Sequence, residues 1–223
     1  MNDLLTMDNR FYPLFIDLRD RLVVVVGGGM VAWRKVEALR RAGARVRVIA
    51  PEVVERIEQD EGLEVVRRGY EPGDLDGAWL VIAATDDEET NVAVSRDAES
   101  RRVFCNVVDQ PGLCSFIVPS VVEKGPIKIA ISTGGVSPAL SKKMRIRIGK
   151  LLGDEYSILA LIMGRIRPIV LSGEGGHEDR KRIFEVLIDS ELLDAIREHN
   201  RDRAEQILFE ALGERIDLTE VLP

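Results

Sequence analysis

The feature that most constrains this chain is a short apolar strand that ends in three consecutive glycines. The strand Leu22–Val26 contains only leucine and valine, as expected for a parallel strand that is covered on both faces. Gly27-Gly28-Gly29 follows it directly, and residues 30–42 then have the apolar spacing that is typical of a helix. This order of strand, glycine turn and helix predicts a Rossmann-type domain that binds a dinucleotide at its first turn.

The glycine turn matches the pattern G-x-G-x-x-A. The first glycine permits the tight turn, the third lets the backbone approach a pyrophosphate, and the alanine permits close packing of helix on strand. The free N–H groups at the helix N-terminus then favour phosphate groups. Six residues are therefore expected to bind the cofactor, NAD: Gly27, Gly28, Gly29, Met30, Val31 and Ala32. The alternative is a glycine turn with a structural role alone.

Strand-like and helix-like runs alternate through the first half of the chain. Further strands are expected at 45–50, 63–67, 79–84 and 103–108, with helices at 51–59 and 88–101. Two strands at 115–122 and 127–132 then suggest a hairpin, a helix begins at Ser137-Pro138, and residues from 154 on are helical with a polar break at 172–179. The prediction is an α/β protein: a Rossmann-like parallel sheet, a small α+β segment and a C-terminal helical region. The expected domains are 1–112, 113–150 and 151–223.

The carboxyl ends of the strands supply the other candidate cofactor residues, because ligands of open α/β sheets bind at that edge. Pro51 follows the second strand, at the place where an acid usually binds the adenosine ribose. Glu52 comes one or two residues late for this role. Thr85 and Asp86 follow the fourth strand, and Asn106 lies on the fifth. Two structural alternatives remain: Asp86 or Asp87 caps the next helix, or Asn106 is bonded to local backbone.

Composition excludes several classes of function. A net charge of −7 and 5% aromatic residues argue against a nucleic-acid partner. The longest apolar run is far shorter than a membrane span of about 20 residues, and the N-terminus does not read as a signal peptide. The two cysteines form neither a disulfide framework nor a zinc site, and the two histidines have no metal-ligand spacing. We expect a cytoplasmic protein with no nucleic-acid or membrane partner and no resident metal.

Several motifs together resemble one family. In order along the chain they are 12–18 (YPLFIDL), 25–29 (VVGGG), 34–35 (RK), 83–87 (AATDD), 106–109 (NVVD), 114–119 (CSFIVP) and 131–139 (ISTGGVSPA). This set is similar to the siroheme-synthase family, in its precorrin-2 dehydrogenase/sirohydrochlorin ferrochelatase part. The resemblance covers residues from about 10 to about 150, and the tail beyond matches only in being helical.

The resemblance implies an activity, partners and a dimer. Precorrin-2, a tetrapyrrole with eight carboxylates, is oxidised to sirohydrochlorin with NAD⁺ as hydride acceptor, and some members also insert Fe²⁺ to give siroheme. Members are homodimers built through the second domain, which makes 113–150 a dimerisation and substrate segment. A chain of 223 residues leaves no room for the methyltransferase of the fused members, so precorrin-2 is expected from another protein.

The resemblance also implies site residues. Asp109 matches the functional aspartate of the motif N-V-V-D and is expected to act as general base; the alternative is a turn aspartate before Pro111-Gly112. The tetrapyrrole carboxylates are expected on the small-residue loop and on the basic helix that follows it: Ser132, Thr133, Gly134, Gly135, Lys142 and Lys143. The alternative for any one of these basic residues is a solvated helix face.

Two other classes of function fit the glycine loop. One is a dinucleotide-sensing dimer module without catalysis, which needs neither Asp109 nor the segment 114–139. The other is a generic NADP oxidoreductase on a small substrate, for which Arg45 and Arg47 are the only support. The pattern leaves iron insertion undecided, because carboxylate-assisted insertion requires no recognisable ligand motif.

Overall fold

The structure, a computed structural model, describes residues 11–173 and 176–222. The contacts within the chain divide it into two compact units, with the division between Val118 and Pro119, and each unit is described here by itself. We expect from the sequence that the N-terminus is not a signal peptide; residues 1–10 lie outside the described part. The domain ranges 1–112, 113–150 and 151–223 stay a prediction.

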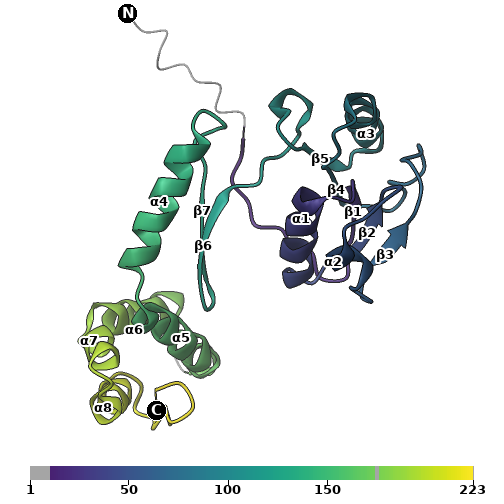
Figure 1. Ribbon diagram of the computed structural model, residues 1–223. Coiled ribbons are helices and arrows are strands. Elements are labelled where there is room, and N and C mark those ends of the chain that lie inside the picture. Colours follow the sequence, from purple (N-terminus) through teal and green to yellow (C-terminus); the bar gives the residue numbers. More distant parts are fainter. Residues whose placement is uncertain (1–10, 174–175, 223) are drawn as a thin grey trace, which may run out of the picture. The chain divides into compact units, whose positions relative to one another are not determined.

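The first unit is built on a five-stranded parallel sheet (Figure 1). The strand order is β3-β2-β1-β4-β5, and every neighbouring pair is parallel. The strands are β1 (Leu22–Val26), β2 (Arg45–Ile49), β3 (Glu64–Val66), β4 (Leu80–Ala83) and β5 (Phe104–Val107). The order reverses beside β1, because the chain goes outward through β2 and β3 and then returns to place β4 on the other side. This is the topological switch point at which such sheets bind their ligands.

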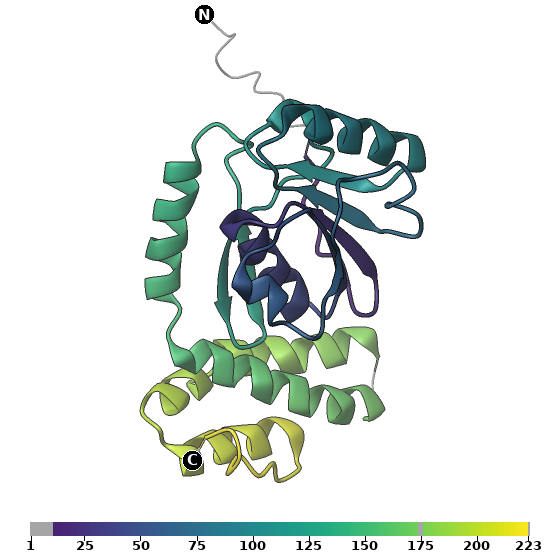
Figure 2. The ribbon, with the colours of Figure 1, turned by 45° about the vertical axis from the view of Figure 1, so that its right-hand side comes forward.

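Helices cover both faces of this sheet, and the alternating valines of β1 decide which helix packs where. Val23 and Val25 share a buried cluster with residues of α1 (Met30–Arg41) and α2 (Glu55–Glu58). Val24 and Val26 share the opposite cluster with residues of α3 (Glu88–Arg101). Figure 2 shows α1 and α3 on opposite sides of the strands. The predicted Rossmann-like fold is confirmed.

Two predicted elements of this unit are wrong. A helix was expected over 51–59, but the helical residues are only Glu55–Glu58. Residues 51–54 instead run along the glycine turn, where the Val54 N–H donates to the Gly28 carbonyl at 2.8 Å. A strand was expected from 115 to 122, but β6 begins only at Ser120. The Ser115 N–H donates to the Cys105 carbonyl at 2.8 Å, so this segment is held by β5. One short 3-10 helix, η1 (Pro111–Leu113), precedes it.

The second unit begins with the predicted hairpin and helix. Strands β6 (Ser120–Lys124) and β7 (Ile127–Ile131) pair antiparallel through a two-residue turn. Gly125 has a φ of +52° in this turn, a value that glycine adopts without strain. Helix α4 (Pro138–Leu151) starts with Ser137 as its N-cap, whose side chain accepts from the Leu140 N–H. The predicted N-cap and first-turn proline are confirmed.

Four helices complete the second unit: α5 (Asp154–Ser172), α6 (His177–Asp189), α7 (Leu192–Arg197) and α8 (Arg201–Leu212). Their apolar faces meet in one core, which includes Ile162, Leu187 and Leu208. The predicted polar break at 172–179 includes residues 174 and 175, which lie outside the described part; α5 ends and α6 begins on either side of them. Among the helices described, none is long and apolar enough to cross a membrane.

Candidate functional site

The register of the sheet brings the predicted cofactor residues to one edge. Val26 is paired with Ile49 and with Ala83, and Ala83 is paired with Val107. These four residues end their strands, so the segments that follow them leave the sheet side by side. Those segments carry the residues expected to bind or act near the cofactor: Gly27, Gly28, Gly29, Pro51, Thr85, Asp86 and Asp109.

The first two glycines of the turn are required by close backbone contacts. Gly27 has a φ of +121°, and a Cβ at this position would lie 2.3 Å from the Ala84 carbonyl oxygen. A Cβ at Gly28 would lie 1.9 Å from the Glu52 carbonyl oxygen. Because both obstacles are backbone atoms, no side-chain rotation relieves them. Gly27 and Gly28 therefore fix the path of the turn.

Gly29 differs, because a Cβ there would meet nothing within 4 Å. Gly29 is the N-cap of α1, makes no side-chain cap hydrogen bond, and no acidic residue lies in the first turn. Met30 and Val31 beside it are 50% and 37% exposed. The N-terminus of α1 is therefore uncapped, and the space beside Gly29 is open. Both features fit the binding of a dinucleotide pyrophosphate at this place. Ala32, fully buried, packs α1 against the sheet.

The segment after β4 is held by its own hydrogen bonds. Asp87 is the N-cap of α3, with its carboxylate accepting from the Glu89 N–H at 3.2 Å and from the Thr90 hydroxyl at 2.5 Å. The Thr90 hydrogen bond lowers the pKa of Asp87. Asp87, and not Asp86, is thus the helix cap that the sequence left open. Asp86 is exposed, and its contact with the cofactor stays a prediction.

Thr85 and Asn91 form a link that the sequence analysis missed. Asn91 is buried, and its Nδ2 donates to the Thr85 carbonyl at 3.0 Å. The Thr85 Oγ1 accepts from the Asp87 N–H at 3.1 Å. Asn91 therefore fixes the segment on which Thr85 and Asp86 lie. A polar residue at the fourth position of a helix gives no sequence signal for such a role.

Asn106 is 9% exposed, and its Nδ2 donates to the Phe116 carbonyl at 3.0 Å. The Cys114 Sγ accepts from the Val107 N–H at 3.2 Å. These bonds attach the segment 114–116 to β5, which matches the local-backbone alternative for Asn106. Contact of Asn106 with the cofactor stays a prediction. Burial raises the pKa of the Cys105 thiol to about 12, so this thiol is not a nucleophile at neutral pH.

Asp109 follows β5 in the left-handed backbone conformation, with φ +61°, and it is exposed. The preceding residue fixes its place: the Val108 N–H donates to the Ala83 carbonyl at 2.9 Å. A non-glycine residue in this conformation is uncommon and is often an aspartate or asparagine. The carboxylate is therefore presented at the same sheet edge as the glycine turn.

Lys35 of α1 is a half-buried charged residue that sequence reasoning did not single out. It lies in the motif Arg34-Lys35, but the motif alone assigns it no role. Burial lowers the pKa of the Lys35 ammonium, repulsion from Arg34 lowers it further, and attraction to Asp109 opposes both.

Arg45 and Arg47, which favoured an NADP enzyme, make contacts with other residues of the chain. The Arg47 Nε lies 2.9 Å from Glu64 Oε1, and the Arg45 Nε donates to the Asp20 carbonyl at 3.1 Å. Arg45 also begins β2, at the end opposite the ribose position. Pro51 lies in a bend after β2 and is exposed; its contact with the ribose stays a prediction.

The predicted substrate residues of the second unit lie between β7 and α4 and on α4 itself. The Thr133 hydroxyl donates to the Ser137 carbonyl at 3.1 Å, and the Gly134 N–H donates to the Ser132 Oγ at 3.0 Å. The loop thus uses part of its polar groups to shape itself, which leaves fewer N–H groups for a carboxylate than expected. Gly135 is exposed, as are Lys142 and Lys143 on α4. Substrate binding by these six residues stays a prediction.

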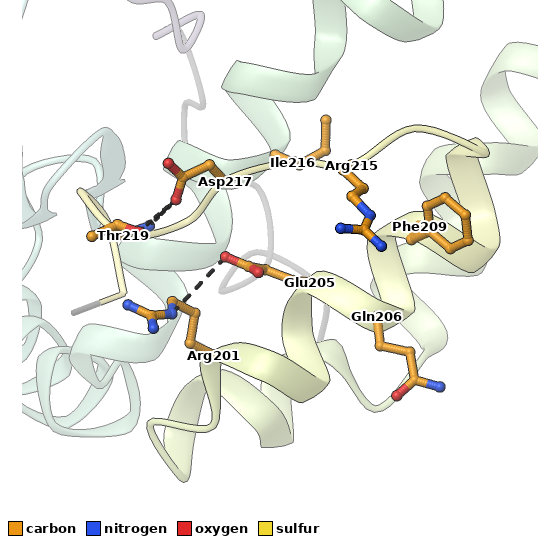
Figure 3. Close-up of a pocket in the computed structure, with 8 residues that line it drawn as sticks. All are labelled: Arg201, Glu205, Gln206, Phe209, Arg215, Ile216, Asp217 and Thr219. Carbon is orange, nitrogen blue, oxygen red and sulfur yellow. Dashed lines mark hydrogen bonds and ion pairs between the residues drawn. The ribbon is translucent and has the colours of Figure 1, made fainter.

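A hollow of about 500 Å³ lies between α8 and the C-terminal segment of the second unit (Figure 3). Its acidic side chains hold the segment in place: Glu205 accepts from the Leu218 N–H at 3.0 Å, and Asp217 accepts from the Thr219 N–H at 2.9 Å. None of the predicted site residues lines it. Within residues 11–173 and 176–222, no group of three or more His, Cys, Asp or Glu is placed to hold a metal ion.

Comparison with known proteins agrees with this geometry. A family model described as "Putative NAD(P)-binding" matches residues 14–120, and one described as "Sirohaem biosynthesis protein central" matches residues 124–151. The first model covers the five-stranded sheet and the glycine turn. Together with the open N-terminus of α1, it supports the predicted cofactor, NAD. The chain is thus an α/β protein with a nicotinamide-dinucleotide domain.

Two similar proteins that match most of this chain are siroheme synthases. The siroheme synthase of Thioalkalivibrio sulfidiphilus is 40% identical over 210 residues, which are 93% of this chain and 43% of that protein. The siroheme synthase of Methylobacillus flagellatus is 41% identical over 203 residues, 88% of this chain and 44% of that protein. The chain is similar to siroheme synthases over about nine-tenths of its own length, and it spans less than half the length of these relatives.

A solved structure has the same fold. It is that of SirC, precorrin-2 dehydrogenase, with a TM-score of 0.75, 22% identity, and coverage of 92% of this chain and all of that one.

Proposed function

We propose that this protein oxidises precorrin-2 to sirohydrochlorin with NAD⁺ in siroheme biosynthesis. One observation carries the proposal: the open, uncapped N-terminus of α1 and the exposed carboxylate of Asp109 lie at the same edge of one sheet. A dinucleotide seated on the glycine turn extends along this edge toward β4 and β5. The names of the siroheme-synthase relatives and of the structural neighbour support the same substrate.

The reaction removes two hydrogens from the macrocycle, one as hydride and one as proton. Bound NAD⁺ supplies the hydride acceptor. Asp109 takes the proton, because it is the carboxylate presented beyond β5 and a positioned base contributes roughly 10²- to 10⁴-fold to rate. Gly27 and Gly28 shape the turn, and the N–H groups beyond Gly29 bind the pyrophosphate.

Insertion of Fe²⁺ into sirohydrochlorin is a second candidate activity at the same place. Two pyrrole protons must leave when the cation enters, and an exposed carboxylate that accepts one proton can accept another after solvent exchange. Asp109 is exposed and belongs to the same edge. Adding Fe²⁺ or Co²⁺ to sirohydrochlorin, with and without the protein, tests this activity separately from the oxidation.

We also propose a homodimer in the cytoplasm. Leu140, Met144 and Leu151 lie at spacings of four and seven residues on one side of α4 and are 49%, 40% and 76% exposed. An exposed apolar stripe of this kind is typical of a protein interface. Cys105 and Cys114 are free thiols, which fits a reducing compartment.

The test is a conversion assay. Purified protein is mixed with precorrin-2 and NAD⁺, and the absorbance of sirohydrochlorin and of NADH is followed. We expect both to rise together in equal amounts. Dinucleotide binding without any conversion would instead favour the alternative, a dinucleotide-sensing module without catalysis.

A further inference from the structure

Helix α3 carries a polar side chain on its buried face. Three residues of α3 are buried, Asn91, Val94 and Ala98, and their spacing of three and four residues places them on one side of the helix. Val94 and Ala98 belong to the apolar cluster on that face of the sheet. Asn91, only 3% exposed, therefore lies at a position where this spacing favours an apolar side chain.

The two ends of the Asn91 amide are used unequally. Its Nδ2 donates to the Thr85 carbonyl at 3.0 Å, whereas its Oδ1 is buried and has no hydrogen-bond partner within the described part of the chain. Burying an unpartnered polar atom is costly, and an apolar residue would avoid this cost. The donation to Thr85 is therefore what distinguishes asparagine from an apolar residue at this position.

The Thr85 carbonyl belongs to the backbone that borders the glycine turn. The Ala84 N–H donates to the carbonyl of Val26, the residue before Gly27, at 2.7 Å. A Cβ on Gly27 would lie 2.3 Å from the Ala84 oxygen and 3.2 Å from the Thr85 nitrogen. The Ala84–Thr85 peptide therefore contacts the turn, with β1 bonded on its N-terminal side and Asn91 bonded on its C-terminal side.

Two side chains join this peptide to α3, one from the exposed side and one from the buried side. On the exposed side, the Asp87 N–H donates to the Thr85 Oγ1 at 3.1 Å. On the buried side, the Asn91 amide donates to the Thr85 carbonyl. Hydrogen bonds are electrostatically stronger where water is excluded, so the buried Asn91 bond is the stronger constraint on the peptide.

We propose that Asn91 is a positioning residue for the NAD⁺ site: its buried amide holds the Ala84–Thr85 peptide against the glycine turn, and this sets the affinity for the dinucleotide. Asn91 does not reach the cofactor, because only 3% of the residue is exposed. Dinucleotides bind this fold over the first turn and the carboxyl ends of the neighbouring strands. A shift of the peptide therefore moves the surface that receives NAD⁺. This inference rests on the proposed function for the identity of the dinucleotide, and it is independent of the substrate.

The first experiment measures NAD⁺ affinity by calorimetric titration, without any turnover. Asn91→Asp keeps the shape of the side chain, but an ionised carboxylate cannot donate to the Thr85 carbonyl. At high pH its Kd for NAD⁺ should exceed the native value by roughly tenfold or more. As the pH falls and the carboxyl is protonated, its O–H donates to Thr85 again, and the two Kd values should converge. Equal Kd values at high pH would overturn the inference.

A second variant keeps the test decisive if Asn91→Asp does not fold. Asn91→Leu continues the apolar face of α3 and should fold, but it offers Thr85 no donor, so its Kd for NAD⁺ should rise at every pH. Val94→Ala is the matched control, because it removes buried atoms from the same face: it should lower the unfolding free energy and leave the Kd nearly unchanged. Native affinity in Asn91→Leu, or an equal loss of affinity in Val94→Ala, would contradict the positioning role.

Hydrogen exchange of the free protein tests the structural step. The Asp87 N–H, which donates to the Thr85 Oγ1, should exchange faster in Asn91→Leu than in the native protein and in Val94→Ala. Unchanged exchange would show that Asn91 does not hold this segment. The conversion assay separates the two claims. A native protein that binds NAD⁺ without oxidising precorrin-2 would contradict the proposed function alone, whereas full NAD⁺ affinity in the Asn91 variants of an active protein would contradict this inference alone.

Discussion

At the scale of single residues, the three glycines of the turn are identical in sequence and different in function. Gly27 and Gly28 avoid backbone carbonyls, whereas Gly29 borders open space at the start of α1. The motif G-x-G-x-x-A predicted the turn, but it did not show that the middle glycine is in contact with the backbone of Glu52. That contact depends on the path of residues 51–54, where the predicted helix was wrong.

This difference predicts opposite effects for two alanine substitutions. Gly29→Ala should leave the unfolding free energy nearly unchanged and weaken NAD⁺ binding by roughly tenfold or more, because the added methyl occupies the approach of the pyrophosphate. Gly28→Ala should destabilise the fold by about 1–3 kcal/mol, because the backbone must shift. Chemical denaturation and calorimetric titration with NAD⁺ separate the two effects. Full NAD⁺ affinity in Gly29→Ala would contradict the assignment of the phosphate position.

Asp109 and Asn106 show what the sequence can and cannot predict about the site. Asp109 is found because it ends a strand in a recognisable motif. Asn106 shows the reverse case: a polar strand-end residue that looks available for a ligand has its Nδ2 engaged by the Phe116 carbonyl.

At the scale of elements, strands and helices set by local signals were predicted well. The boundaries of β1 and α3 agree with the expectation, because β1 is a continuous buried apolar run. The helix at 51–59 and the strand at 115–122 were wrong for a shared reason. Both segments take their conformation from hydrogen bonds to distant backbone, Val54 with Gly28 and Ser115 with Cys105, which local propensity does not contain.

The loop after β3 provides a test of stability and its pH dependence. Asp74 is buried and accepts two hydrogen bonds from Arg68, at 2.7 and 2.8 Å, and these lower its pKa from 3.8. Asp74→Asn should reduce the unfolding free energy by about 1–3 kcal/mol at pH 7. Because the folded pKa is lowered, this contribution is present above pH 3.8 and is lost as the pH falls through the folded pKa. Urea titrations should therefore show the two proteins converging in acid.

A matched control removes a surface charge from the same loop. Asp76 forms an ion pair with Arg101 at 2.6 Å, but its side chain is 71% exposed. Asp76→Asn should change the unfolding free energy by less than about 1 kcal/mol, as is usual for exposed ion pairs. If Asp76→Asn and Asp74→Asn were equally destabilising, burial of the Asp74–Arg68 pair would not be the cause.

At the scale of the whole molecule, the two units divide the proposed work. The first unit holds the dinucleotide turn and Asp109, and the second holds the hairpin, α4 and the helical core. The sequence predicted this order of α/β, hairpin and helices. The assembly is a property of surfaces that local patterns describe poorly, because residues exposed in one chain become buried only beside a second copy.

The proposed homodimer predicts a mass of twice 24.9 kDa in sedimentation analysis. Met144→Glu places a charge in the exposed apolar stripe of α4 and should shift the protein toward monomer, because burying an unpaired carboxylate is costly. Glu123→Gln on β6, a polar change at an exposed residue, should leave the mass unchanged. A native protein that sediments as a monomer at micromolar concentration would exclude the dimer.

The most direct test of the central claim compares the native protein with Asp109→Asn, a substitution that retains a residue type common in the left-handed conformation. Conversion of precorrin-2 with NAD⁺ is followed by sirohydrochlorin absorbance, and NAD⁺ binding is measured on both proteins. We predict equal NAD⁺ affinity and turnover that is lower in Asp109→Asn by roughly 10²- to 10⁴-fold. Equal turnover in the two proteins would contradict the account of a carboxylate acting beside the dinucleotide.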